Sequence, residues 1–190
     1  YVERLDAGAR LIRAVLNRLT GGGLGPRDMA ELARLATALH RNGWINAAIA
    51  GSSVDGAHFA EGIAKAATED GGGVQDCLDA VRRLAFAVRD RLSLDMWHTL
   101  NHLLDEVRRS LVAGARDMDH LLDALDDLVR VIAAFAGLAS ENMTRGAGWR
   151  FLDIGRRIER GIAITHTLAP VLKGPAAQLE VGLRLSLELC

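Results

Sequence analysis

The side chains best placed to do chemistry lie near the carboxyl end of the sequence, where an acid is surrounded by arginines. Glu159 has Arg156 three residues before it and Arg160 directly after it. On a helical wheel Glu159 lies about 100° from an apolar stripe, which places it at the edge of the predicted core. A carboxylate in that position needs a guanidinium partner, and Arg156 is one helical turn away. The stripe consists of Phe151, Ile154, Ile158, Ile162 and Thr165.

A second acid–base dipeptide, Glu3-Arg4, opens the sequence. With an offset of 156 positions, Val2-Glu3-Arg4 matches Ile158-Glu159-Arg160, so that the two segments form a weak repeat. Duplication and chance are both open explanations. We expect the two dipeptides to meet at one seam between neighbouring helices.

Three functions fit these residues. They can be structural ion pairs that clamp the first helix to a late one. They can instead line a pocket for an anion or a peptide terminus, because arginine presents a planar fork that suits carboxylate and phosphate. In the third interpretation Glu159 is a catalytic carboxylate. The candidate binding or structural cluster is Glu3, Arg4, Arg145, Trp149, Arg150, Arg156, Glu159 and Arg160, and no residue is assigned as catalytic.

Other constellations give weaker signals. His98, His102, Asp105 and Glu106 share one helix face at a spacing that could hold a metal ion, although a solvated face explains them equally well. No metal and no cofactor are therefore predicted. The glycine clusters at 21–25 and 71–73 lack the Lys-Ser/Thr of a phosphate loop. Cys77 and Cys190 form no disulfide framework, which favours a reducing cytoplasm.

Composition excludes several classes of protein. The 190 residues carry a formal net charge of −1, and no basic stripe accompanies the few aromatic residues, so that nucleic-acid binding is not expected. No run of about 18 uncharged apolar residues occurs, so no membrane span is expected. The abundance of alanine and leucine favours helices.

Hydrophobic periodicity predicts an all-α fold, an up-and-down bundle of six to eight helices with short connections. We expect a single domain over residues 1–190, cut from a longer chain. The predicted helices span 1–19, 26–41, 54–68, 74–90, 94–112, 117–142, 149–168 and 176–190, and 44–56 is a short helix or a loop.

The sequence resembles the Alpha-E family, a helical domain of unknown function named for its Glu-Arg motifs. The resemblance rests on Gly148-Trp149-Arg150-Phe151-Leu152, Gly155-Arg156 and Glu159-Arg160, with support from Val88–Ser93, Trp97, Leu100-Asn101 and Tyr1-Val2-Glu3-Arg4. Gly161 departs from the pattern, where alanine is more usual. Members are often encoded beside, or fused to, a circularly permuted ATP-grasp ligase and a transglutaminase-like protein.

The resemblance implies an accessory or substrate-presenting module of an ATP-dependent peptide or amide ligation system. The expected partners are an ATP-grasp ligase domain, fused or separate, and a transglutaminase-like protein. Two alternatives stay open. The domain can be an enzyme that uses Glu159 as a general acid–base, or a purely structural dimerisation bundle and hence a homo-oligomer.

Overall fold

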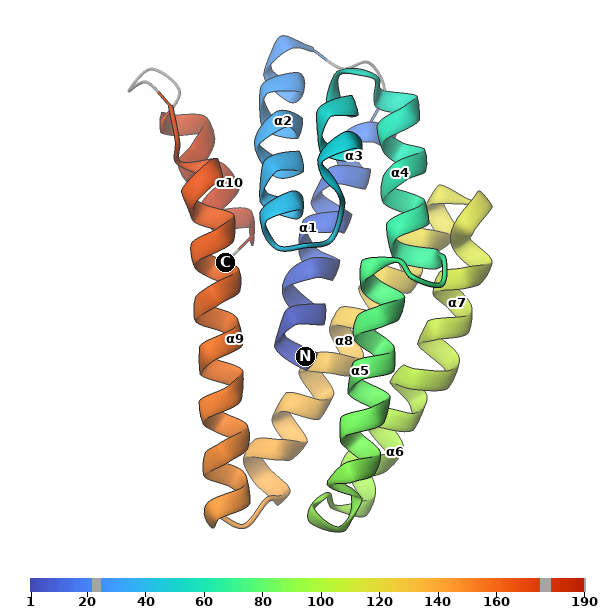
Figure 1. The fold of residues 1–190 in the computed structure, drawn as a ribbon, viewed down its shortest axis with the longest axis vertical. Helices are drawn as coiled ribbons and strands as arrows, with labels where there is room; N and C mark the ends of the chain where they lie inside the picture. Colours follow the sequence, from blue (N-terminus) through green and yellow to red (C-terminus); the bar gives the residue numbers. More distant parts are fainter. Residues whose placement is uncertain (22–24, 175–178, 190) are drawn as a thin grey trace.

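The computed structural model describes residues 1–21, 25–174 and 179–189, and every regular element among them is helical (Figure 1). The all-α fold class is thereby confirmed. The α-helices are α1 (Val2–Thr20), α2 (Pro26–Arg41), α3 (Ala47–Gly51), α4 (Gly56–Thr68), α5 (Gly73–Ala87), α6 (Leu94–His102), α7 (Arg108–Ala113), α8 (Met118–Asn142), α9 (Ala147–Val171) and α10 (Leu179–Leu189). Short 3₁₀ turns at Ser52–Val54, Arg89–Arg91 and Gly114–Arg116 complete the connections.

Polar side chains fix where several helices begin. Ser93 accepts a hydrogen bond from the Met96 amide at 3.3 Å, and Asp117 accepts from the amides of Asp119 and His120. These acceptors satisfy amide groups that lack a partner in the first helical turn. The starts of α6 and α8 therefore follow from the sequence alone.

Helix α1 is central to the bundle and contacts α2, α4, α5, α8, α9 and α10. Its inward face carries Leu5, Ile12 and Leu16, which are fully buried. Helices α1 and α9 run in the same direction, whereas α2 runs opposite to both (Figure 1). In Figure 1 the first turn of α1 lies level with the middle of α9.

The predicted helix over 94–112 is interrupted. Residues Leu103–Val107 form a π-helical segment between α6 and α7. Arg82 of α5 donates to the carbonyl oxygen of Leu104 at 3.1 Å and to Asp105 at 3.0 Å, within this segment. A wider turn that a side chain of another helix stabilises leaves no mark in hydrophobic periodicity, so the sequence could not reveal it.

Helix α9 differs from its prediction in two respects. It does not end before Pro170 but continues to Val171, because a proline in the last turn removes only one hydrogen bond near an end. The apolar stripe from Phe151 to Ile162 was predicted to face the core, and this was wrong: Phe151 is 77% exposed and Ile158 57% exposed. Periodicity identifies an apolar face but not what covers it.

The buried residues of α9, Ala163, Thr167, Pro170 and Val171, all lie in its second half. At the other end of the chain, the predicted helix over 176–190 is observed as α10, and its predicted first residue Ala176 and last residue Cys190 lie outside the described residues. No helix among the described residues is both long and apolar enough to cross a membrane.

We predict that Gly8→Ala destabilises the protein by about 1–3 kcal/mol, because a Cβ atom on Gly8 of α1 would overlap ring atoms of Trp44. Urea unfolding followed by circular dichroism measures the change. Gly137→Ala is the matched control: it lies in α8 with nothing within 4 Å of the added carbon, so that it should stabilise by up to about 1 kcal/mol. Equal effects of the two substitutions would contradict the packing interpretation.

Candidate functional site

Two parallel helices bring the Glu-Arg dipeptides together. Glu3 and Arg4 lie in the first turn of α1, while Arg156, Glu159 and Arg160 lie in the middle of α9. Side chains three and four residues apart lie on the same side of a helix, so that Arg156 and Arg160 can both reach one partner on α1. We call these five residues the ER clamp.

Glu3 is the buried centre of the ER clamp, with 8% of its surface exposed. One carboxylate oxygen accepts a hydrogen bond from Nε of Arg156 at 2.6 Å. The other accepts two from Arg160, from Nε at 3.1 Å and from Nη2 at 2.9 Å. A single acid of α1 is thus held by two arginines one turn apart on α9.

Arg4 and Glu159 form the reciprocal half of the ER clamp. Nε and Nη2 of Arg4 donate to the two oxygens of Glu159 at 3.0 and 2.7 Å, a bidentate pair. The sequence suggested that Glu159 would pair with Arg156 inside one helix. Instead each acid pairs with arginine from the other helix, because the two helices lie side by side.

Electrostatics stabilise the charged form of Glu3. Burial by itself raises the pKa of this carboxyl group, but the hydrogen bonds and positive charges of Arg156 and Arg160 outweigh burial. The pKa of Glu3 is therefore held below its ordinary value. Glu3 is an ionised acceptor at neutral pH and not a proton donor.

Cys77 of α5 lies beside the ER clamp, with Sγ 3.6 Å from the carbonyl oxygen of Tyr1. Burial raises the pKa of its thiol to about 11. The thiol is therefore protonated at neutral pH and a poor nucleophile, which fits the role of a small core residue.

An apolar groove of about 380 Å³ adjoins the ER clamp. Its walls come from α5 and α9, and the first turn of α1 closes one end. Phe135 of α8 and Leu100 of α6 also line it. Sequence analysis did not find this groove, because its residues come from five separate segments. Its wall residues include Leu84 of α5, Val88 directly after α5, and Phe151, Leu152, Arg156, Ile158 and Glu159 of α9.

The other candidate residues do not join the ER clamp through any contact seen here. Arg145 stacks over the ring of Trp149, with its Cζ atom 5.4 Å from the ring centroid. Arg150 is exposed and forms no ion pair with a described residue. These three residues lie around the start of α9, before the segment that contacts α1.

The candidate metal residues also remain dispersed. Nδ1 of His102 lies 2.9 Å from Glu106, and its Nε2 lies 3.8 Å from Asp127 of α8. Within residues 1–21, 25–174 and 179–189, no three His, Cys, Asp or Glu side chains converge in a way that could hold a metal ion. His102 therefore lies between Glu106, four residues further along its own helical segment, and Asp127 of α8.

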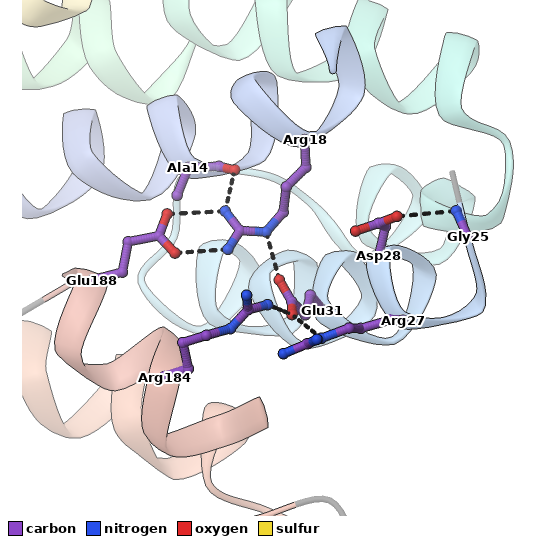
Figure 2. A network of polar contacts seen from close by, with 8 residues as sticks. All are labelled: Ala14, Arg18, Gly25, Arg27, Asp28, Glu31, Arg184 and Glu188. Atoms are coloured by element: carbon purple, nitrogen blue, oxygen red, sulfur yellow. Dashed lines mark hydrogen bonds and ion pairs between the residues drawn. The ribbon is translucent and has the colours of Figure 1, made fainter. Parts of the chain in front are cut away.

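A second charged network, which the sequence analysis missed, joins α1, α2 and α10 (Figure 2). Glu31 of α2 is almost fully buried and accepts from Arg18 at 2.9 Å and from Arg184, with Arg27 at 3.5 Å. Arg18 also pairs with both oxygens of Glu188, at 2.9 and 2.7 Å. In the sequence, Arg27 and Glu31 are four residues apart, and so are Arg184 and Glu188. This spacing was the signal that could have indicated a charged network.

Comparison with known proteins identifies a family. The profile of the Alpha-E family, described as a predicted alpha-helical domain with a conserved ER motif, matches residues 1–190. Uncharacterised proteins of Mycobacterium bovis and of two Mycobacterium tuberculosis strains are each 30% identical over 116 residues. The match covers 58% of this chain and 13% of each relative, so this chain corresponds to a small part of their length. No solved structure matches.

We predict that Glu3→Gln lowers the free energy of unfolding by about 2–3 kcal/mol near pH 7. The loss should be smaller than the 3–5 kcal/mol typical of a fully buried pair, because both arginines reach solvent. The pKa of Glu3 is lower in the folded state, so its contribution is complete above its ordinary pKa of 4.5 and disappears as the pH falls through the lower folded value.

Urea unfolding of both proteins at about pH 7 and about pH 3 measures this dependence. The gap between wild type and variant should shrink at the lower pH. Exposed Glu141→Gln, at the end of α8, is the control and should change little at either pH. A gap of constant size would show that Glu3 acts through packing alone.

We predict that Glu31→Gln lowers stability by about 3 kcal/mol and loosens α10, because three arginines then lose the shared negative charge and one of its two acceptor oxygens becomes a donor amide. Hydrogen exchange of the amides in residues 179–189 should accelerate more than that of α8. Glu180→Gln, an exposed substitution in α10, is the control. Unchanged exchange in α10 would mean that apolar contacts alone hold this helix.

Proposed function

The chain belongs to the Alpha-E family, and we propose that it is an accessory, substrate-presenting module of an ATP-grasp-linked peptide or amide ligation system. Its partners are an ATP-grasp ligase domain, fused or separate, and a transglutaminase-like protein. The ligase supplies the ATP-dependent activation, and the helical domain holds a polypeptide or the ligase in position.

The observation that carries this proposal is the apolar groove beside a fully engaged ER clamp. Both carboxylates of the ER clamp accept hydrogen bonds from arginines of the opposite helix, which favours a structural role for them over proton transfer. The groove next to them is lined mainly by carbon atoms, which suits binding rather than bond making.

An enzymatic role for Glu159 as general acid–base is the alternative. It would require the carboxylate to leave its bidentate pair with Arg4. A purely structural dimerisation bundle is the second alternative, and the exposed stripe of α9 favours it, because large apolar patches often mark protein interfaces. Light scattering that gives a monomer at working concentration would remove the second alternative.

A charge swap separates the accessory role from catalysis. We predict that the double variant Arg4→Glu/Glu159→Arg keeps most of the ATP-dependent amide formation of the ligase system, because the ion pair is rebuilt with its ends exchanged. Glu159→Arg alone should destabilise the domain by roughly 1–2 kcal/mol and lower activity with it. The amide product formed per ATP hydrolysed measures activity, and thermal unfolding of each variant measures stability.

A catalytic acid cannot be moved to the opposite helix without loss of the reaction. If the double variant folds normally but loses amide formation by a hundredfold or more, Glu159 acts in the chemistry. If the ligase works equally well with the helical domain left out, the accessory role is excluded.

A further inference from the structure

Two stacked arginine–tryptophan pairs lie at one end of the bundle, where α5 leads into α6 and α8 leads into α9 (Figure 1). The guanidinium carbon of Arg89 lies 4.5 Å from the ring centroid of Trp97. The guanidinium carbon of Arg145 lies 5.4 Å from the ring centroid of Trp149. Two separate connections of the chain thus present the same combination of a cation and an aromatic ring at the same end.

Apolar side chains lie beside the first pair. Phe86 packs edge-on against Trp97, with the ring centroids 5.1 Å apart, and is still 61% exposed, while Leu94 is 62% exposed. Apolar side chains that gather on a protein surface commonly mark a site of interaction. We call the following residues the Arg–Trp face: Phe86, Arg89, Leu94, Trp97, Arg145, Trp149 and Arg150. The apolar groove beside the ER clamp is lined by other residues.

The guanidinium groups of the Arg–Trp face have no acidic partner in the described part of the chain, which applies to Arg89, Arg145 and Arg150. The acids nearby are already engaged. Asp90 pairs with Arg91 at 2.9 Å, and Asp95 of α6 accepts a hydrogen bond from Asn142 of α8 at 3.4 Å. The hydrogen bond between Asp95 and Asn142 also joins the two connections to each other. The Arg–Trp face therefore offers positive charge that the domain itself does not neutralise.

Stacking prepares these arginines for a carboxylate ligand. A guanidinium held against an aromatic ring has less conformational freedom to lose when a ligand binds. Its planar set of N–H donors matches the two oxygens of a carboxylate, and such charge-assisted hydrogen bonds are stronger than neutral ones. The ligand that fits the Arg–Trp face consequently carries carboxylates together with apolar groups.

The arrangement of charge favours a polypeptide over a nucleic acid. Single-stranded nucleic acids carry a phosphate at every nucleotide and stack their bases on open aromatic faces. Here an arginine covers one face of each tryptophan, and Asp90 and Asp95 interrupt the positive charge. A polypeptide can place carboxylates only where the arginines lie and apolar side chains on Phe86 and Leu94.

We infer that the Arg–Trp face binds an acidic segment of a partner polypeptide, with carboxylates on its arginines and interspersed apolar side chains on Phe86 and Leu94. This inference rests on the proposed function, because it names the kind of segment through which the domain holds its partner.

Designed peptides test this chemistry with the whole chain. The probe is a fluorescently labelled peptide of about 12 residues, long enough to span about 40 Å when extended, in which Glu and Leu are spaced by Ser and Gly. Matched peptides carry Gln or Lys in place of every Glu. Fluorescence anisotropy should show that the Glu peptide binds at least tenfold more tightly than the Gln peptide, and the Lys peptide most weakly.

Variants of the Arg–Trp face locate the binding site. The double variant Arg89→Gln/Arg145→Gln should weaken binding of the Glu peptide about tenfold, because it removes both stacked cations. Arg116→Gln is the matched control. Arg116 is exposed, forms no ion pair with a described residue and lies in the turn between α7 and α8, away from the Arg–Trp face. This control should leave affinity unchanged, and thermal unfolding checks that all variants are folded.

The apolar part of the site has its own variant. Leu94→Gln keeps the charge of the Arg–Trp face and should weaken the Glu peptide about threefold, because an exposed apolar contact is lost. A peptide with Ser in place of every Leu should bind the wild type and Leu94→Gln equally well. Equal loss of both peptides on Leu94→Gln would contradict an apolar contact at this position.

Three results would overturn the inference as a whole: equal affinity for the Glu and Gln peptides, no saturable binding, or a loss of binding in Arg116→Gln as large as in the double variant. Tighter binding of single-stranded DNA than of the Glu peptide, abolished by the double variant, would assign the Arg–Trp face to nucleic acid. Binding of phosphatidylserine vesicles that the Glu peptide cannot displace would assign it to a lipid surface.

The outcome is distinguishable from that of the proposed function. Peptide binding without any effect of the domain on amide formation would exclude the accessory role and leave the Arg–Trp face as a peptide site. Dependence of the ligase on this domain without peptide binding would do the reverse.

Discussion

The structure depends on a reciprocal exchange of ion pairs between α1 and α9. Glu3 is held by Arg156 and Arg160, and Glu159 is held by Arg4, so each helix supplies both an acid and a base. Since α9 buries no residue in its first half, and only the partly buried Leu152 of that half packs against the core, this exchange is the main polar tie between that half and the bundle. A buried acid with its arginines in place tolerates only one alignment of the two helices, and it therefore fixes the shape of the neighbouring groove.

The same principle recurs at the far end of α1. There Glu31 gathers arginines from α1, α2 and α10, and Glu188 shares Arg18 with it (Figure 2). Helix α10 buries only Gly182 and Leu185, so charged contacts carry much of its attachment. Two buried acids, one near each end of α1, thus anchor the carboxyl-terminal helices to the amino-terminal one. The apolar core is built by α1, α2, α4, α5 and α8, with further residues from α6, Leu103–Val107 and α7.

Sequence patterns predicted the local features well where the cause was local. The starts of α6 and α8 followed from Ser93 and Asp117, whose side chains accept from amides only a few residues away. The π-helical segment at Leu103–Val107 could not be predicted, because Arg82 of another helix donates to it. The stripe from Phe151 to Ile162 was read correctly as one apolar face and wrongly as buried, since burial depends on what stands opposite.

The sequence by itself determined the helical fold class, most helix bounds and the pairing potential of the two Glu-Arg dipeptides, because these depend on residue types at fixed spacing along one helix. Tertiary structure alone decided that α1 and α9 lie parallel at matching height, that Arg156 pairs with Glu3 rather than with Glu159, and that the residues of an apolar groove come together beside them. The ion pairs join residues more than 150 positions apart, the groove joins five separate segments, and no periodicity along the chain encodes a distance across it.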